Sequence, residues 1–123
     1  MYLVDTCGWI EWLTNGKLLS SFEKYLKDTK NLLVPSIVQY ELFKWICREK
    51  DEVCAFDVIG VTESANVIPI DTAIAISAAK ISREYKLAMA DSVVLASAQK
   101  AKAQVITCDS HFKNLPGVVY FKK

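Results

Sequence analysis

Tyr2-Leu3-Val4-Asp5-Thr6 opens the chain with three apolar residues that run directly into an aspartate, and Gly8 interrupts the apolar run soon afterwards. This pattern predicts a short buried strand that ends in a carboxylate. A strand that is apolar on both faces is typical of the inside of a parallel sheet covered by helices. Because ligands of such sheets bind beyond the carboxyl ends of the strands, where the topology reverses, we expect Asp5 to stand at a binding edge.

Predicted helices and strands alternate along the rest of the chain. We expect strands at 31–34, 66–70, 104–107 and 118–121, helices at 9–13, 17–28, 35–50, 51–64, 72–85 and 89–102, and a turn with a short helical piece over 109–115. Pro35 is expected at the first position of its helix, where proline is tolerated best. This alternation predicts an α/β fold with right-handed crossovers, a three-layer α/β/α sandwich, and leaves the strand order open.

The length and composition predict one folded domain over residues 1–123, without repeats or a linker. A hydrophobic share of 52% excludes a disordered chain, and a net charge of +1 gives no general argument for nucleic acid. The high apolar share points to a surface covered by a partner or by a second copy, so we expect a dimer.

The sequence also indicates where the protein works. No apolar run approaches a membrane span of roughly 20 residues, and no signal peptide is recognisable. Its four cysteines lack CxxC spacing and the regularity of a disulfide framework. They suit a reducing compartment, so we expect a cytoplasmic protein.

Asp109 ends the fourth predicted strand in the way that Asp5 ends the first. It follows the apolar stretch Val105-Ile106-Thr107-Cys108. If these two strands are neighbours, their carboxylates face each other across the binding edge. Each also has a structural interpretation, Asp5 as a strand-end turn residue and Asp109 as an Asx-turn.

Glu41 interrupts an apolar helical stripe formed by Ile37, Val38 and Trp45. A buried carboxylate is costly unless it is paired, protonated or bound to a metal ion. At 1.5 Å per residue, Glu41 lies about 9 Å from the start of its helix. Because helical side chains lean towards the helix N-terminus, Glu41 can reach back to the edge of the sheet.

Asp91 begins another inward stripe, continued by Val94, Leu95 and Ala98. Its helix leads by a tight connection into the fourth strand, so the helix runs antiparallel to that strand and begins near the same edge. The structural alternative for Asp91 is a helix N-cap. Asp71, after Pro69-Ile70 and before an Ala-rich helix, is interpreted as a cap.

The mapping of several acids to one edge favours a bound cation, because clustered carboxylates repel one another. Oxygen ligands with room for water favour Mg²⁺ or Mn²⁺ over zinc. Cys7, Cys108 and His111 form a weaker alternative, a zinc site, since a lone histidine with scattered thiols rarely binds one.

The chain resembles a PIN domain, and within that family the VapC-type toxins of prokaryotic toxin–antitoxin pairs. The resemblance rests on an ordered set of motifs: Leu3-Val4-Asp5-Thr6, Val38-Gln39-Tyr40-Glu41-Leu42, Ala88-Met89-Ala90-Asp91-Ser92, Thr107-Cys108-Asp109-Ser110-His111-Phe112 and Leu115-Pro116-Gly117-Val118. It implies a Rossmann-like sheet of about five strands in the order 3-2-1-4-5. It also implies a metal-dependent ribonuclease whose acidic quartet is Asp5, Glu41, Asp91 and Asp109. One position departs from the family pattern, because many members carry a second acid where His111 stands.

The resemblance implies a chemistry as well. One or two divalent ions would polarise the scissile phosphate and activate a water for in-line attack, leaving 5′-phosphate and 3′-hydroxyl ends. Hydrogen-bonding or phosphate-contacting roles then fall to Thr6, Thr107, Ser110 and His111. RNA needs positive charge beside the acids, and the candidates are Lys44, Arg48, Lys86 and Lys113.

The aromatic residues of the first helices have two interpretations. They are Trp9, Trp12, Phe22, Phe43 and Trp45. They pack in the core, or they line a hydrophobic groove for a segment of a cognate antitoxin, as the family suggests.

Other functions are compatible with the αβ alternation. A phosphorelay receiver domain would use Asp71 as phosphoacceptor, but the chain lacks the paired acid after the first strand and the Lys-Pro that receivers carry. A phosphatase with an Asp-x-Asp nucleophile is excluded because Cys7 stands at the second position. A catalytically idle PIN scaffold that binds RNA or protein is a third alternative.

Overall fold

The computed structural model describes residues 1–123 as five strands, six α-helices and one 3₁₀ helix. The strands are β1 (Tyr2–Val4), β2 (Leu32–Pro35), β3 (Asn66–Ile68), β4 (Gln104–Thr107) and β5 (Val118–Tyr120). The helices are α1 (Thr6–Leu13), α2 (Leu19–Leu26), α3 (Ser36–Glu49), α4 (Glu52–Glu63), α5 (Thr72–Tyr85), α6 (Met89–Ala101) and the 3₁₀ helix η1 (Ser110–Phe112). None of these helices is long and apolar enough to cross a membrane.

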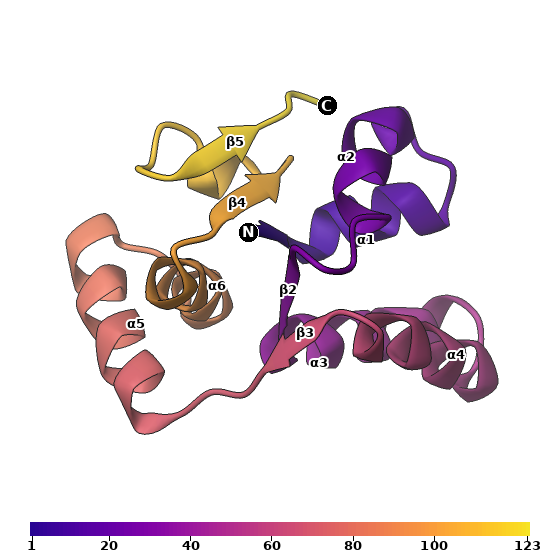
Figure 1. Cartoon of the computed structure of the whole chain (residues 1–123), viewed down its shortest axis with the longest axis horizontal. Coiled ribbons are helices and arrows are strands. Elements are labelled where there is room, and N and C mark those ends of the chain that lie inside the picture. Colours follow the sequence, from indigo (N-terminus) through magenta and orange to yellow (C-terminus); the bar gives the residue numbers. More distant parts are fainter.

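All neighbouring strands run parallel, in the order β3-β2-β1-β4-β5. Leu3 lies opposite Leu33 on one side and Val105 on the other, so β1 is the central strand. Helices α1–α4 cover one face of the sheet and α5 and α6 cover the other (Figure 1). The expected three-layer α/β/α sandwich and the strand order implied by the family resemblance are both confirmed.

Side chains on both faces of the central strands form the core. Leu3 and Val4 point to opposite faces and neither is exposed to solvent, as a strand between two helical layers requires. Among the aromatic residues, Trp9 and Phe22 are fully buried, whereas Trp12, Phe43 and Trp45 pack only partly against the core.

The boundaries of several elements differ from those expected from the sequence. Helix α1 begins at Thr6 rather than Trp9, directly after the extended backbone of Asp5. The sequence did not predict this start because Thr-Cys-Gly has little intrinsic helix propensity, so that tertiary contacts must hold the first turn. Pro35 ends β2 and precedes α3 instead of starting the helix. Strand β3 ends at Ile68 rather than Ile70, since Pro69 cannot donate a hydrogen bond to the sheet.

Gly8 lets α1 approach the sheet closely. A Cβ atom at this position would lie 2.5 Å from Val4 Cγ1 and 2.6 Å from Phe22 Cδ1. Gly60, in the last turn of α4, has no neighbouring atom within 4 Å of the same position. The first glycine is therefore required by packing, and the second is not.

We predict opposite effects of alanine at these two glycines. Gly8→Ala should lower the free energy of unfolding by about 1–3 kcal/mol, because the added methyl group overpacks the contact between α1 and the sheet. Gly60→Ala should raise it by about 0.5–1 kcal/mol, because alanine loses less backbone entropy in a helix. Urea unfolding followed by circular dichroism measures both, and a stabilised Gly8→Ala variant would contradict the packing argument.

Candidate functional site

Asp5 stands where β1 passes into α1 without an intervening loop. Its backbone N–H donates to the Ile106 carbonyl at 3.0 Å, which ties it to β4. Its side chain is buried, only 4% exposed, and accepts hydrogen bonds at Oδ2 from the Thr107 hydroxyl at 3.1 Å and the Cys7 thiol at 3.6 Å. It makes no side-chain cap of α1. Its carboxylate is thus held between the end of β4 and the first turn of α1.

Glu41 reaches the same region from α3. Its carboxylate is partly buried and accepts a hydrogen bond from the Thr6 hydroxyl at 2.7 Å. Because Thr6 is the first residue of α1 and directly follows Asp5, this bond places Glu41 beside the end of β1. The expectation that Glu41 leans back to the edge of the sheet agrees with this geometry.

Asp91, Asp109 and His111 form a second group of side chains. The Nδ1 atom of His111 lies 3.2 Å from Asp91 Oδ2 and 3.2 Å from Asp109 Oδ1. One potential ligand atom from each of the three lies within 4.8 Å of the others. Asp91 is in the first turn of α6, whose N-cap is Ala88, so Asp91 is not the cap.

Asp109 forms the turn that follows β4 and also contributes its carboxylate to the group with Asp91 and His111. Its carboxylate accepts the backbone N–H of His111 at 2.9 Å, the turn expected from the sequence. Its own N–H donates to the Thr107 hydroxyl at 2.9 Å. Thr107 is fully buried, so it links Asp109 to Asp5 from inside the protein and does not face a substrate.

The carboxylates influence one another's pKa. Burial raises the pKa of Asp5 well above its usual value, and nearby Cys7 adds to this. Repulsion from Asp91 and Glu41 raises the pKa further. Burial also raises the pKa of Asp91, followed by repulsion from Asp109, while His111 opposes the rise. Burial and mutual repulsion therefore disfavour the ionised forms of Asp5 and Asp91 when no cation is bound.

This donor set fits a hard divalent cation. The groups that converge are the carboxylates of Asp91 and Asp109 and the imidazole of His111, all of which can bind a divalent cation, whereas Asp5 and Glu41 lie outside this group of three. The cysteines are not part of it. Cys7 Sγ lies 3.3 Å from the Thr107 hydroxyl and accepts the Cys108 N–H at 3.2 Å. Because His111 turns to the two aspartates, the alternative zinc site from the cysteines is not formed.

The positively charged candidates fall in different places. Lys44 and Arg48 lie on α3 around a hollow that Thr6 and Glu41 also line. Lys113 lies 6.0 Å from the centre of the Tyr120 ring. Lys86 follows α5 in the left-handed conformation, and both Lys86 and Ser110 are exposed.

Two residues of this region have contacts that the sequence does not predict, although Cys7 is a candidate zinc ligand from the sequence. Cys7 donates directly to Asp5, and its pKa is raised by its hydrogen bond with Cys108 and by burial, so it is a neutral thiol. Glu11 is a buried acid on α1 whose carboxylate lies 3.0 Å from Lys123 Nζ. The partner of Glu11 is remote in the sequence, and Cys7 contacts the remote Thr107 and Cys108 as well as its near neighbour Asp5.

Asp71 is not part of the acidic group. Its carboxylate accepts the Ile74 N–H at 2.8 Å and caps α5. Its ion pair with Lys100 and this hydrogen bond lower its pKa. The interpretation of Asp71 as a cap is confirmed, which removes the basis of the receiver-domain alternative.

A family model for the PIN domain matches residues 2–118. The chain belongs to the PIN domain family. Among functionally curated proteins, none matches the sequence.

Solved structures place this PIN domain among toxin folds. A toxin–antitoxin complex from Klebsiella pneumoniae matches with 26% identity over 97% of this chain and 96% of that one, with a TM-score of 0.80. DNA-bound VapBC from Salmonella typhimurium matches with 20% identity over 98% and 96%, TM-score 0.77. VapC20 of Mycobacterium tuberculosis, a toxin that cleaves the sarcin–ricin loop, matches with 14% identity over the full length of both chains, TM-score 0.78. The expected likeness to VapC-type PIN domains is confirmed.

The raised pKa of Asp5 leads to a prediction about stability without metal. An acid whose pKa is higher in the folded than in the unfolded protein lowers stability at every pH above the folded pKa, because its ionised form is the costly one. In a chelator at neutral pH, Asp5→Asn should therefore melt a few degrees above the parent, measured by differential scanning calorimetry. The difference in melting temperature between the variant and the parent should become smaller as the pH falls through the pKa of Asp5 in the folded protein. A variant that melts below the parent at every pH would show that the hydrogen bonds of the carboxylate outweigh its repulsion.

Proposed function

We propose that this PIN domain is a divalent-metal-dependent ribonuclease and the toxin of a toxin–antitoxin pair. The observation that carries the proposal is that Asp91, Asp109 and His111 bring potential ligand atoms within 4.8 Å of one another. Asp5 and Glu41 lie close enough to add to the electrostatics of this group, because burial and then repulsion among these acids raise the pKa of Asp5 and of Asp91. Family membership and the fold shared with a sarcin–ricin loop cleaving toxin support it.

The four carboxylates, with His111 beside them, would hold Mg²⁺ or Mn²⁺. When bound, the ion supplies positive charge that polarises the scissile phosphate and acidifies water. The rest of the work belongs to the protein. Thr6 orients the Glu41 carboxylate, and Thr107 orients Asp5 while fixing the backbone of Asp109. Such supporting hydrogen bonds keep ligands in a geometry that suits the cation.

His111 has two available roles in this arrangement. Its Nδ1 atom lies between Asp91 and Asp109, where a proton on that nitrogen reduces the repulsion between the two acids. The side chain is 70% exposed, so the rest of the ring is open to solvent and to a phosphate. Lys44, Arg48, Lys86 and Lys113 would supply the positive charge that RNA requires, since the net charge of +1 provides none overall.

We predict that Asp5→Asn and Asp91→Asn abolish Mg²⁺- or Mn²⁺-dependent RNA cleavage while circular dichroism still shows a folded protein. Thr6→Val should lower cleavage roughly 10–100-fold, because Glu41 loses the group that orients it. Asp71→Asn is the matched control and should cleave at the parent rate. Cleavage of a labelled RNA by both aspartate variants at the parent rate would refute the site. A parent that cleaves no RNA with either ion would favour the catalytically idle scaffold.

The proposed antitoxin has a groove available on the face formed by α1, α3 and α4. A hollow of about 210 Å³ is lined by apolar groups that include Leu13, Trp45, Ile46 and Val58. Leu13 and the nearby Val53 of α4 expose much of their apolar surface to solvent. This arrangement supports the groove interpretation for Trp45, whereas Trp9 and Phe22 belong to the core. An amphipathic segment of a partner would cover such a groove.

Leu13→Asp should therefore prevent co-purification of the protein with an antitoxin encoded beside it, without changing RNA cleavage by the isolated protein. A charged group in the groove removes the apolar contact and stays unpaired after binding. Co-expression followed by affinity purification measures this. Retention of the antitoxin by the variant would place the docking surface elsewhere.

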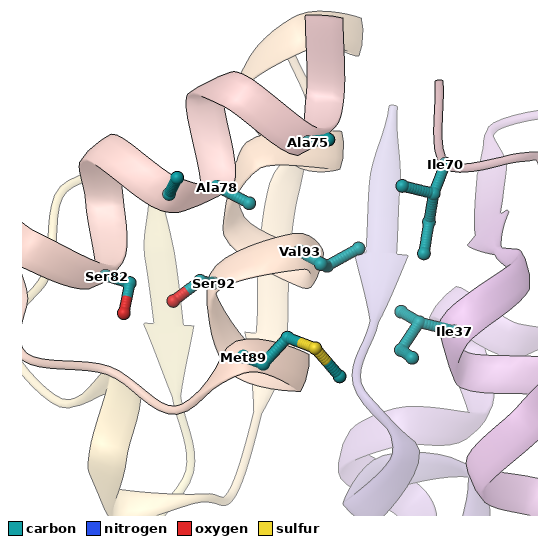
Figure 2. Close-up of a pocket in the computed structure, with 9 residues that line it drawn as sticks. Ile37, Ile70, Ala75, Ala78, Ser82, Met89, Ser92 and Val93 are labelled. Atoms are coloured by element: carbon teal, nitrogen blue, oxygen red, sulfur yellow. The ribbon is translucent and has the colours of Figure 1, made fainter. Parts of the chain in front are cut away.

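We further propose that a second copy of the chain covers the apolar face of α5 and α6. A hollow of about 370 Å³ between these helices and α3 is lined mainly by apolar residues, and Figure 2 shows Met89 pointing across it towards Ile37. Met89 is 73% exposed, and Ile70 and Ile76 are also exposed. Apolar surface of this kind is commonly covered by association.

Self-association through this face predicts that the parent is a dimer and Met89→Asp is a monomer, because the introduced charge would be buried unpaired at the contact. Light scattering coupled to size-exclusion chromatography distinguishes the two states. A monomeric parent, or a dimeric variant, would contradict this assignment of the face.

A further inference from the structure

A second hollow opens directly beside Glu41. It lies between α1 and α3, has a volume of about 280 Å³, and its surrounding residues include Thr6, Ile10, Tyr40, Glu41, Lys44 and Arg48. Unlike the two apolar hollows, it combines an acid of the candidate site, two cations and an aromatic ring. Its volume lies near the lower limit of small-ligand pockets, so it holds a group about the size of one nucleoside.

Tyr40 presents its aromatic ring to solvent at the mouth of this hollow. The residue is 58% exposed and is not among those that pack against the core. Large exposed aromatic side chains are uncommon on a protein surface and are enriched where bases or partners bind. Since Tyr40 directly precedes Glu41, its position is fixed by the same helix that positions the acid.

Two cations continue from Tyr40 along the same stripe of α3. Lys44 and Arg48 follow at intervals of four residues, the spacing that places side chains on one helical face. Lys44 Nζ lies 5.9 Å from the centre of the Tyr40 ring and forms no ion pair with a carboxylate. Arg48 contacts only its neighbour Glu49, at 3.5 Å, and is largely exposed. Both cations are therefore available to phosphate groups.

We propose that this hollow is a subsite for a nucleotide of single-stranded RNA, in which the base stacks on Tyr40 and the backbone phosphates contact Lys44 and Arg48. The proposal rests on the proposed ribonuclease function and assigns its substrate a binding mode. Stacking on a side chain requires an unpaired base, so the strand must be single there. The adjacent phosphodiester then lies next to the Glu41 carboxylate. Ile10 and Thr6 form the opposite wall.

The charge of the hollow favours RNA over a protein segment as its occupant. Its exposed rim carries Lys44 and Arg48 beside an aromatic ring, the combination found in grooves that follow a nucleic-acid backbone. A peptide helix instead requires an apolar surface, and the adjacent hollow around Leu13 and Val58, which shares Trp45 with this one, is the more apolar of the two.

Binding of a fluorescent single-stranded oligoribonucleotide to the full-length protein tests the proposal. The Asp91→Asn background prevents cleavage, and fluorescence anisotropy reports the affinity. Tyr40→Ala should weaken binding roughly tenfold, the loss of one base–aromatic stack, and Tyr40→Phe should restore it because the ring suffices. Lys44→Ala should reduce the salt dependence by about one phosphate contact. Phe56, an equally exposed aromatic (59%) on α4 outside the hollow, supplies the control variant Phe56→Ala, which should bind as the parent does.

Each contrary result has a definite meaning. Unchanged binding by Tyr40→Ala, or equal weakening by Tyr40→Phe, would overturn the stacking subsite. If double-stranded RNA competed with the labelled oligonucleotide as well as single-stranded RNA does, the requirement for an unpaired base would be overturned. If Tyr40→Ala lost antitoxin binding but kept RNA binding, the hollow would be assigned to the protein partner. Tyr40-dependent RNA binding by a parent that cleaves no RNA would leave the subsite standing and reject the ribonuclease.

Discussion

A carboxylate buried at the end of the central strand is the constraint on which the remainder of the structure depends. Asp5 is almost removed from solvent, and burial of an ionised carboxylate is costly. Hydrogen bonds from Thr107 and Cys7 offset part of that cost, but the neighbouring acids increase it. The protein therefore keeps, at the end of its central strand, a group whose ionised form opposes folding.

The sheet order explains how distant residues reach this group. With β1 between β2 and β4, the helix that follows β2 and the helix that precedes β4 both have their N-terminal ends at the carboxyl edge of the sheet. Glu41 and Asp91 are delivered by these two helices, and Asp109 by the end of β4 itself. Acids separated by up to a hundred residues thus share one edge because a parallel sheet places all its strand ends together.

Much of this arrangement could be predicted from the sequence, because apolar periodicity indicates the strands and helices. A charged residue that interrupts an apolar stripe indicates a candidate functional residue. Glu41 was recognisable for that reason. The start of α1 at Thr6 was not, since its first turn is built from residues with weak helix propensity. The burial of Glu11 and the contacts of Cys7 with Thr107 and Cys108 were not predicted, because the partners of these two residues lie about a hundred residues away and no local pattern encodes the contacts.

The direct passage from β1 into α1 restricts how the chain can change in length. Asp5 and Thr6 belong to a strand end and to a helix start with no residue between them. A single inserted residue there would turn the Thr6 hydroxyl away from Glu41 and shift Asp5 from Thr107, so two supports would be lost together. The turn between η1 and β5, by contrast, is exposed and ends at Gly117. A change of length at that turn would leave both of these supports in place, whereas the junction that carries Asp5 is expected to keep a constant length.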